Sequence, residues 1–99
     1  MSVEDGSIVY SKVIEENLEK GVQFRLVVNE FREQTYIQFR KYFLSYEGEW
    51  LPSKEGVSAP VSFDNVYAIL DGMFDICSQA EGEEIIERYY KKIKGIVDE

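Results

Sequence analysis

A chain of 99 residues has room for one domain, which excludes a multidomain enzyme. Apolar residues make up 44% and charged residues 30% of the chain, a balance typical of folded proteins rather than disordered ones. Eleven basic residues against 19 acidic ones give a net charge of -8, which as a total argues against binding to nucleic acid or anionic membranes. We expect a single domain over residues 1–99, with a β-sheet region at 8–60 and a C-terminal helical region at 62–97.

Residues 8–14, with the sequence IVYSKVI, are rich in β-branched side chains and predict a first strand. From residue 22 onward apolar side chains alternate with polar ones, which predicts a second strand with a buried apolar face and an exposed polar face. A second alternation covers residues 35–43. Because only a short connection separates the two alternating segments, we expect them to form a hairpin.

Residues 45–60 contain two glycines, two prolines and several charges, which predicts an exposed loop with a brief strand near residues 56–59. Ser62 is the expected N-cap of a first helix, whose apolar stripe runs from Val66 to Cys77 at helical spacing. A second helix is predicted from about residue 83 to residue 97. Its acidic residues precede its basic ones, an order that suits the helix dipole.

The chain has few residues of the types that form disulfides, bind zinc or act in nucleophilic catalysis. Cys77 is the single cysteine and histidine is absent, so an internal disulfide is excluded and a structural zinc site is not expected. Without histidine, the chain also cannot contain a Ser-His or Cys-His pair for nucleophilic catalysis. Glu47 and Glu49 are interpreted as solvated loop carboxylates. We therefore expect no enzyme activity, no catalytic residue, no metal and no cofactor.

The start of the chain is acidic and has no long apolar run, so we expect neither a targeting segment nor a membrane partner. The protein is expected to be intracellular, in the cytoplasm of a bacterium or a phage-infected host, or in the nucleus if it is eukaryotic.

The negative charge is not spread evenly along the chain. Residues 21–60 carry five basic and five acidic residues and are neutral, so the net charge belongs to residues 1–20 and 61–99. The neutral segment places arginines among aromatic rings. Single-stranded nucleic acid is bound by this combination, because cations contact its phosphates and rings stack on its bases. The alternative is that these residues form ordinary solvated strand faces.

Four short motifs follow one another in this neutral segment and lead into the first helix. They are Phe31-Arg32, the stretch FRKYF at 39–43, the stretch EGEWLP at 47–52, and GVS at 56–58. With them, residues 22–77 resemble the DNA-binding domain of transcriptional positive cofactor 4, a coactivator family with eukaryotic, bacterial and phage members. The absence of a long N-terminal tail favours a phage or bacterial type of member.

The resemblance implies an α+β fold in which a curved four-stranded antiparallel β-sheet is followed by C-terminal helices, in a homodimer. It further implies binding to single-stranded or melted DNA without sequence specificity, in transcription coactivation and regulation, DNA replication or DNA recombination. By position in the motifs, Phe31 and Phe43 are expected to stack on bases, and Arg32, Arg40 and Lys54 to contact phosphates. Arg40 is also expected on the exposed polar face of its strand.

Two further residues extend this predicted DNA-binding site. Arg25 lies on the polar face of the neighbouring strand and is expected to widen the surface. Trp50 is either a further stacking ring or packs against its own domain or a dimer mate. An alternative function also stays open, in which the acidic helices make the protein an interaction module that recruits a replication or transcription protein.

Overall fold

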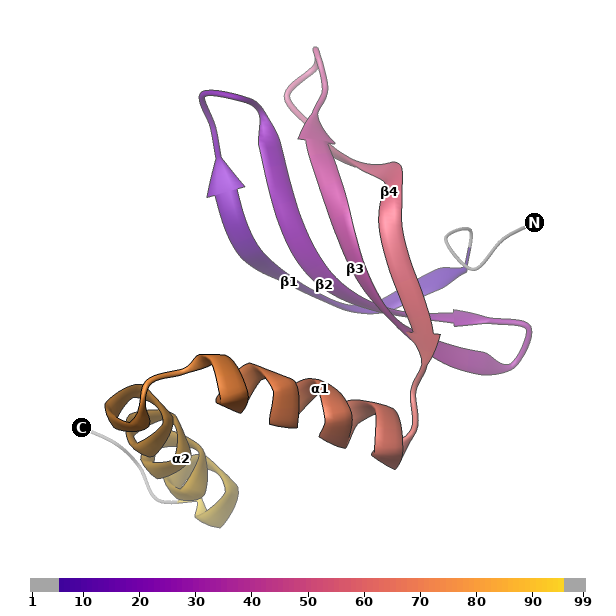
Figure 1. Cartoon of the computed structure of the whole chain (residues 1–99). Coiled ribbons are helices and arrows are strands. Elements are labelled where there is room, and N and C mark those ends of the chain that lie inside the picture. Colours follow the sequence, from indigo (N-terminus) through magenta and orange to yellow (C-terminus); the bar gives the residue numbers. More distant parts are fainter. Residues whose placement is uncertain (1–5, 96–99) are drawn as a thin grey trace. The chain divides into compact units, whose positions relative to one another are not determined.

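In the computed structural model, which describes residues 6–95, four strands precede two helices (Figure 1). The elements are β1 (Ser7–Asn17), β2 (Val22–Phe31), β3 (Gln34–Leu44), β4 (Trp50–Pro60), α1 (Phe63–Ile76) and α2 (Gln79–Lys94). The strands form one antiparallel sheet in the order β1-β2-β3-β4. The predicted α+β fold, a four-stranded antiparallel sheet followed by C-terminal helices, is confirmed. The chain divides into two compact units, here called the sheet unit and the helical unit, with the boundary between Ser62 and Phe63.

The prediction of an exposed loop at residues 45–60 is wrong for most of that segment, because residues 50–60 form the full-length strand β4. Two features let a sequence with two prolines pair along β3. β4 is an edge strand, where a missing N–H breaks no pairing on the outer side. Its register also shifts: Arg40 pairs with Gly56 but Tyr42 pairs with Pro52, so β4 has two extra residues at this point. Only the turn before Trp50 remains a loop.

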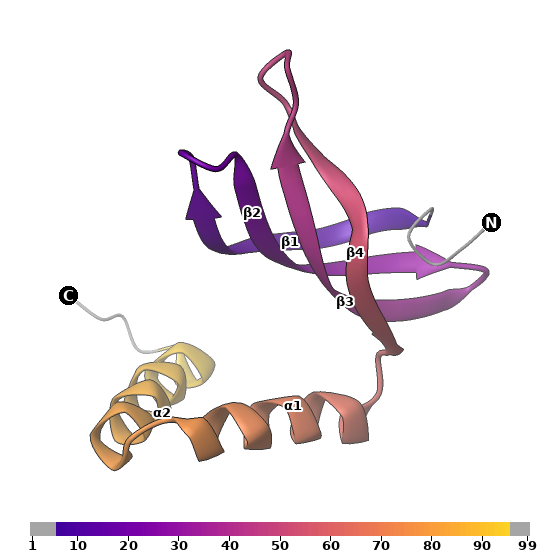
Figure 2. The same ribbon diagram turned by 45° about the horizontal axis from the view of Figure 1, so that its top comes forward.

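The sheet is strongly twisted and curved (Figures 1 and 2). Register shifts interrupt β1 between Ile8 and Tyr10 and again between Val13 and Glu15, in addition to the shift in β4. Such irregularities bend a strand and increase its local twist. Both edge strands therefore follow the curve of the central hairpin β2–β3, whose ten paired positions run without a shift.

Alternation divides the sheet residues into the two predicted faces, but the prediction of which face is buried is wrong. We define the polar face by residues 23, 25, 27 and 29 of β2 and 36, 38, 40 and 42 of β3, and the apolar face by residues 22, 24, 26 and 28 of β2 and 37, 39, 41 and 43 of β3. Gln23, Asn29 and Gln38 on the polar face are buried, whereas Phe24 on the apolar face is 41% exposed. Alternation determines which residues share a face, and it leaves open which face is covered.

The second helix begins four residues earlier than predicted, at Gln79, because Ser78 and Glu81 form a capping box. The Ser78 hydroxyl accepts a hydrogen bond from the N–H of Glu81, and the Glu81 carboxylate accepts one from the N–H of Ser78. Gly95, in the left-handed conformation, ends the helix. Residues 96–97, the predicted end of this helix, lie outside the described residues. No helix in residues 6–95 is long and apolar enough to cross a membrane.

Stability of α2 is expected to depend on pH through this capping box. The hydrogen bond from the Ser78 backbone, reinforced by the Ser78 hydroxyl, lowers the pKa of Glu81. A carboxyl group with a lowered pKa stabilises the folded state above its unfolded pKa, and this contribution is lost as the pH falls through the lowered value. The difference in melting temperature between wild type and Glu81→Gln should therefore be largest at neutral pH and shrink on acidification. A difference that stays constant with pH would contradict the assignment.

Candidate nucleic-acid interface

The centre of the polar face is built from a tripeptide that occurs twice. Gln23-Phe24-Arg25 lies in β2 and Gln38-Phe39-Arg40 lies in β3, and Arg25 and Arg40 are directly paired in the register. On the apolar face the two phenylalanine rings stack, with their centroids 6.1 Å apart. In each copy the arginine Nε donates a 2.8 Å hydrogen bond to the glutamine Oε1 of its own strand. Each arginine side chain thus points toward the start of its own strand. Because the two strands are antiparallel, the two side chains point in opposite directions along the sheet.

Arg25 is held by three groups and remains partly accessible. Besides its bond to Gln23, the guanidinium lies over the Tyr42 ring, 4.1 Å from the centroid, and donates a 3.4 Å hydrogen bond to the Ser11 hydroxyl. All three of these partners are neutral, although Gln23 itself donates to the carboxylate of Glu16. The arrangement fixes the plane of a planar cation that has five hydrogen-bond donors, the geometry suited to phosphate.

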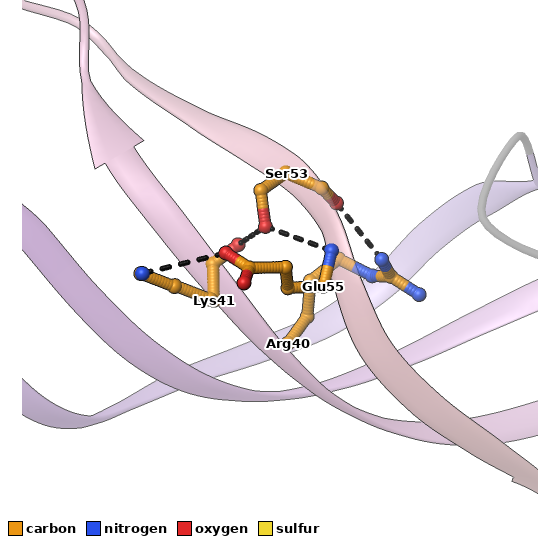
Figure 3. A network of polar contacts seen from close by, with 4 residues as sticks. All are labelled: Arg40, Lys41, Ser53 and Glu55. Carbon is orange, nitrogen blue, oxygen red and sulfur yellow. Dashed lines mark hydrogen bonds and ion pairs between the residues drawn. The ribbon is translucent and has the colours of Figure 1, made fainter.

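Arg40 differs from Arg25, because only 5% of it is exposed. The prediction that it lies on an exposed face is wrong. Its Nη1 donates a 2.9 Å hydrogen bond to the Ser53 carbonyl oxygen, so the guanidinium ties β3 to β4 (Figure 3). Gly56 makes room for it: a Cβ at this position would lie 2.8 Å from the Arg40 Cζ. The structure gives Arg40 a role in holding the sheet together, and its predicted contact with phosphate remains a prediction.

The extra residues of β4 form a polar network next to Arg40 (Figure 3). The Ser53 hydroxyl donates to the Lys41 carbonyl oxygen at 2.7 Å and accepts from the N–H of Glu55 at 3.0 Å. Lys41 Nζ and a Glu55 carboxylate oxygen lie 3.3 Å apart, in an exposed ion pair that contributes little to stability. Lys54 is exposed within this irregular stretch. The network therefore holds the backbone on both sides of Lys54.

Phe31 and Arg32 lie at the tip of the β2–β3 hairpin. Arg32 and Glu33 form its two-residue turn, and both have positive φ angles, 52° and 65°. This conformation matches the twist of a hairpin but strains residues that have a Cβ atom. The exposed Arg32 guanidinium lies 5.1 Å from the centroid of the half-buried Phe31 ring. A cation and an aromatic ring are thus presented side by side at one end of the sheet.

Relief of this strain is expected to stabilise the hairpin. Glu33→Gly should raise the free energy of unfolding by up to about 1 kcal/mol, because glycine adopts positive φ without a steric cost. Glu33→Ala removes the same charge but keeps the Cβ atom, so it should give no gain. Urea denaturation of the two variants makes the comparison, and an equal gain in both would show that charge rather than backbone strain is responsible.

The seven predicted site residues do not form one cluster. Arg25 and Arg40 are neighbours at the centre of the polar face, while Phe31 and Arg32 lie at the hairpin tip. Trp50 is half-buried and pairs with Leu44, which places it on the same side of the sheet as the polar face. Lys54 lies further along β4. Phe43, 42% exposed, belongs to the apolar face and pairs with Leu51, so the structure separates it from the others.

Sequence reasoning missed the residues that hold the arginines in place. They are Gln23, Gln38, Tyr42, Ser53 and Gly56. The repeated Gln-Phe-Arg tripeptide was a signal for the two glutamines, because residues two apart in a strand share a face. The positions of Ser53 and Gly56 relative to Arg40 depend on the register shift in β4, for which the sequence has no comparable signal.

Comparison with known proteins adds evidence that is independent of this geometry. The family model described as Transcriptional Coactivator p15 (PC4) matches residues 18–62. Over these residues the chain is similar to the PC4 family. The family match spans β2, β3 and β4, and so includes all seven predicted site residues of the chain. The resemblance stated from the motifs is confirmed.

A PC4 homologue of known structure extends the similarity beyond this segment. It is the bacteriophage T5 homologue of the eukaryotic transcription coactivator PC4, implicated in recombination-dependent DNA replication. The two chains are 28% identical with a TM-score of 0.65, and the match covers 86% of this chain and 94% of the phage chain. A comparison with curated protein sequences gave no match.

Proposed function

We propose that the protein is a homodimer that binds single-stranded or melted DNA without sequence specificity, in transcription, DNA replication or DNA recombination. The observation that carries the proposal is the similarity to the phage T5 homologue over nearly its whole length, since that protein is implicated in recombination-dependent DNA replication. The PC4 family match adds the description of a transcriptional coactivator. We further propose that the protein acts by binding alone, without covalent chemistry, and is intracellular.

The accessible residues of the predicted site support binding through phosphate and base contacts. Arg25, Arg32 and Lys54 are basic and not buried, and Phe31 and Trp50 are half-buried rings on the same sheet. Guanidinium and ammonium groups bind phosphates by charge, while aromatic rings stack on bases of any identity. A surface of this kind follows the backbone and tolerates different sequences. Acidic residues outside the neutral segment would repel DNA elsewhere on the protein.

Exposed apolar surface supports the homodimer. Neither helix contains a buried residue, although α1 and α2 carry apolar stripes. The apolar face of the sheet also presents Phe24 and Phe43 with about two fifths of their surface exposed. Contiguous exposed apolar surface is typical of protein interfaces in soluble proteins. We propose that a second copy of the chain covers part of this surface.

The proposal is tested by fluorescence anisotropy with a labelled oligo-dT and a duplex of equal length, at low salt. We expect binding to oligo-dT and weaker binding to the duplex. Absence of binding to oligo-dT would overturn the proposed function, and equal affinity for the duplex would overturn the single-strand preference.

A second candidate function is an interaction module for a transcription or replication protein. It is favoured by α1, in which Asp64, Asp71 and Asp75 are the only charged residues. A replication protein that is captured through this helix, and released when the three aspartates are replaced by asparagine, would support it. This function is compatible with DNA binding by the sheet unit.

A further inference from the structure

The apolar stripe of α2 is open to contact with another molecule. Ile86, Tyr89, Tyr90 and Ile93 of α2 are each more than half exposed. Together with Leu70 and Phe74 of α1 they line a hollow of about 570 Å³ in the helical unit. Such a hollow, with almost no polar lining, accepts an apolar segment better than a charged one.

Charge is arranged along α2 in two halves. The four glutamates, at 81, 83, 84 and 87, all precede the four basic residues, at 88, 91, 92 and 94. Two of the basic residues lie at the edges of the apolar stripe, since Lys92 Nζ is 5.3 Å from the Tyr89 ring centroid and Lys94 Nζ is 5.8 Å from that of Tyr90. The ion pairs described within α2, Arg88 with Glu84 and Lys91 with Glu87, use neither lysine.

Helix geometry places an acidic residue on the same edge as each of these lysines. Eleven residues make about three turns of an α-helix, so residues that far apart lie on one side. Glu81 is eleven residues before Lys92, and Glu83 is eleven residues before Lys94. Each edge of the stripe therefore begins with a carboxylate and ends with an ammonium group.

We propose that α2 pairs antiparallel with α2 of a second copy of the chain, with the apolar stripes in contact and the acidic half of each helix beside the basic half of the other. An antiparallel pair related by a two-fold axis brings Glu83 of each chain near Lys94 of its mate, whereas a parallel pair would place like charges together. A second α2 has the reversed charge order by symmetry. This inference rests on the proposed homodimer and specifies its helical contact.

Charge reversal at one edge tests the arrangement by sedimentation equilibrium at low salt. Glu83→Lys and Lys94→Glu each replace two attractive contacts per dimer with two repulsive ones, so each should raise the dimer dissociation constant about tenfold. The double variant Glu83→Lys with Lys94→Glu should dimerise like wild type. A mixture of the two single variants should form heterodimers. Glu84→Lys is the matched control, because Glu84 lies opposite the stripe, and it should leave association unchanged.

The outcomes separate this inference from the proposal on which it rests. A wild-type dimer in which Glu83→Lys and Glu84→Lys act equally, or in which the double variant is not restored, overturns the α2 contact and leaves the homodimer standing. A wild-type monomer at micromolar concentrations overturns both, and points to the chain's own sheet as the cover of the stripe. Circular dichroism of each variant shows that the helices are still formed.

Discussion

Replacement of Arg40 with alanine is expected to lower the free energy of unfolding of the sheet unit by about 3 kcal/mol. The change leaves the buried amide of Gln38 and the carbonyl of Ser53 without their charged donor and opens a void above Gly56. Arg40→Lys should recover little of this free energy of unfolding. A single ammonium group does not replace the planar guanidinium group, which donates hydrogen bonds to both β3 and β4. Urea denaturation measures each loss.

Arg32→Ala is the control for charge, since it removes the same charge from an exposed position at the hairpin tip. Its effect on stability should stay within about 0.5 kcal/mol, as for other surface substitutions. If Arg40→Ala were no more destabilising than Arg32→Ala, the guanidinium would not be a structural link between β3 and β4. That result would instead favour the original prediction, in which Arg40 is accessible and contacts a phosphate.

The second large effect is expected on DNA binding, from Phe31→Ala. Stacking of a base on an aromatic ring contributes about 1 to 3 kcal/mol, so loss of the Phe31 ring should weaken oligo-dT binding by about tenfold or more. Phe43→Ala removes the same ring from the apolar face and should change the affinity less than about threefold. Fluorescence anisotropy under identical salt conditions measures both.

Phe31 and Phe43 were both predicted to stack on bases. Comparison of the two variants therefore tests which face of the sheet binds DNA. A larger loss from Phe43→Ala than from Phe31→Ala would place the DNA on the apolar face. The proposed site would then have to be rebuilt around Phe24, Phe43 and Lys41. Equal stability of the two variants, measured by urea denaturation, is needed for the comparison.

Local sequence patterns predicted β1, β2, β3 and the helical stripes well, because alternation and helical spacing are properties of short segments. They did not predict which side of the sheet is buried. Arg40 was expected to be exposed because its neighbours are polar, yet Gln38 and Ser53 form a hydrogen-bonded network around it. Burial of polar groups depends on hydrogen-bond partners that the curvature of the sheet brings together. The sequence of a single strand does not identify these partners.

The limits at β4 and α2 have different physical causes. Two prolines suggested a loop, whereas an edge strand with a register shift tolerates both, and this pairing follows from β3 rather than from the segment itself. The start of α2 was predictable, since Ser78 and Glu81 have the spacing of a capping box. The residue types of the candidate site could be recognised in the sequence. Their separation into the centre of the polar face, the hairpin tip and the apolar face could not, because it depends on how the strands pair.

The salt dependence of oligo-dT binding shows most directly whether a protein of net charge -8 binds DNA through a few local cations. For single strands, log K falls with log salt by about 0.7 for each phosphate neutralised. We expect a clear negative slope for wild type and a slope shallower by about 0.7 for Arg25→Ala. A flat salt dependence, or no binding at the lowest salt concentration, would contradict the account.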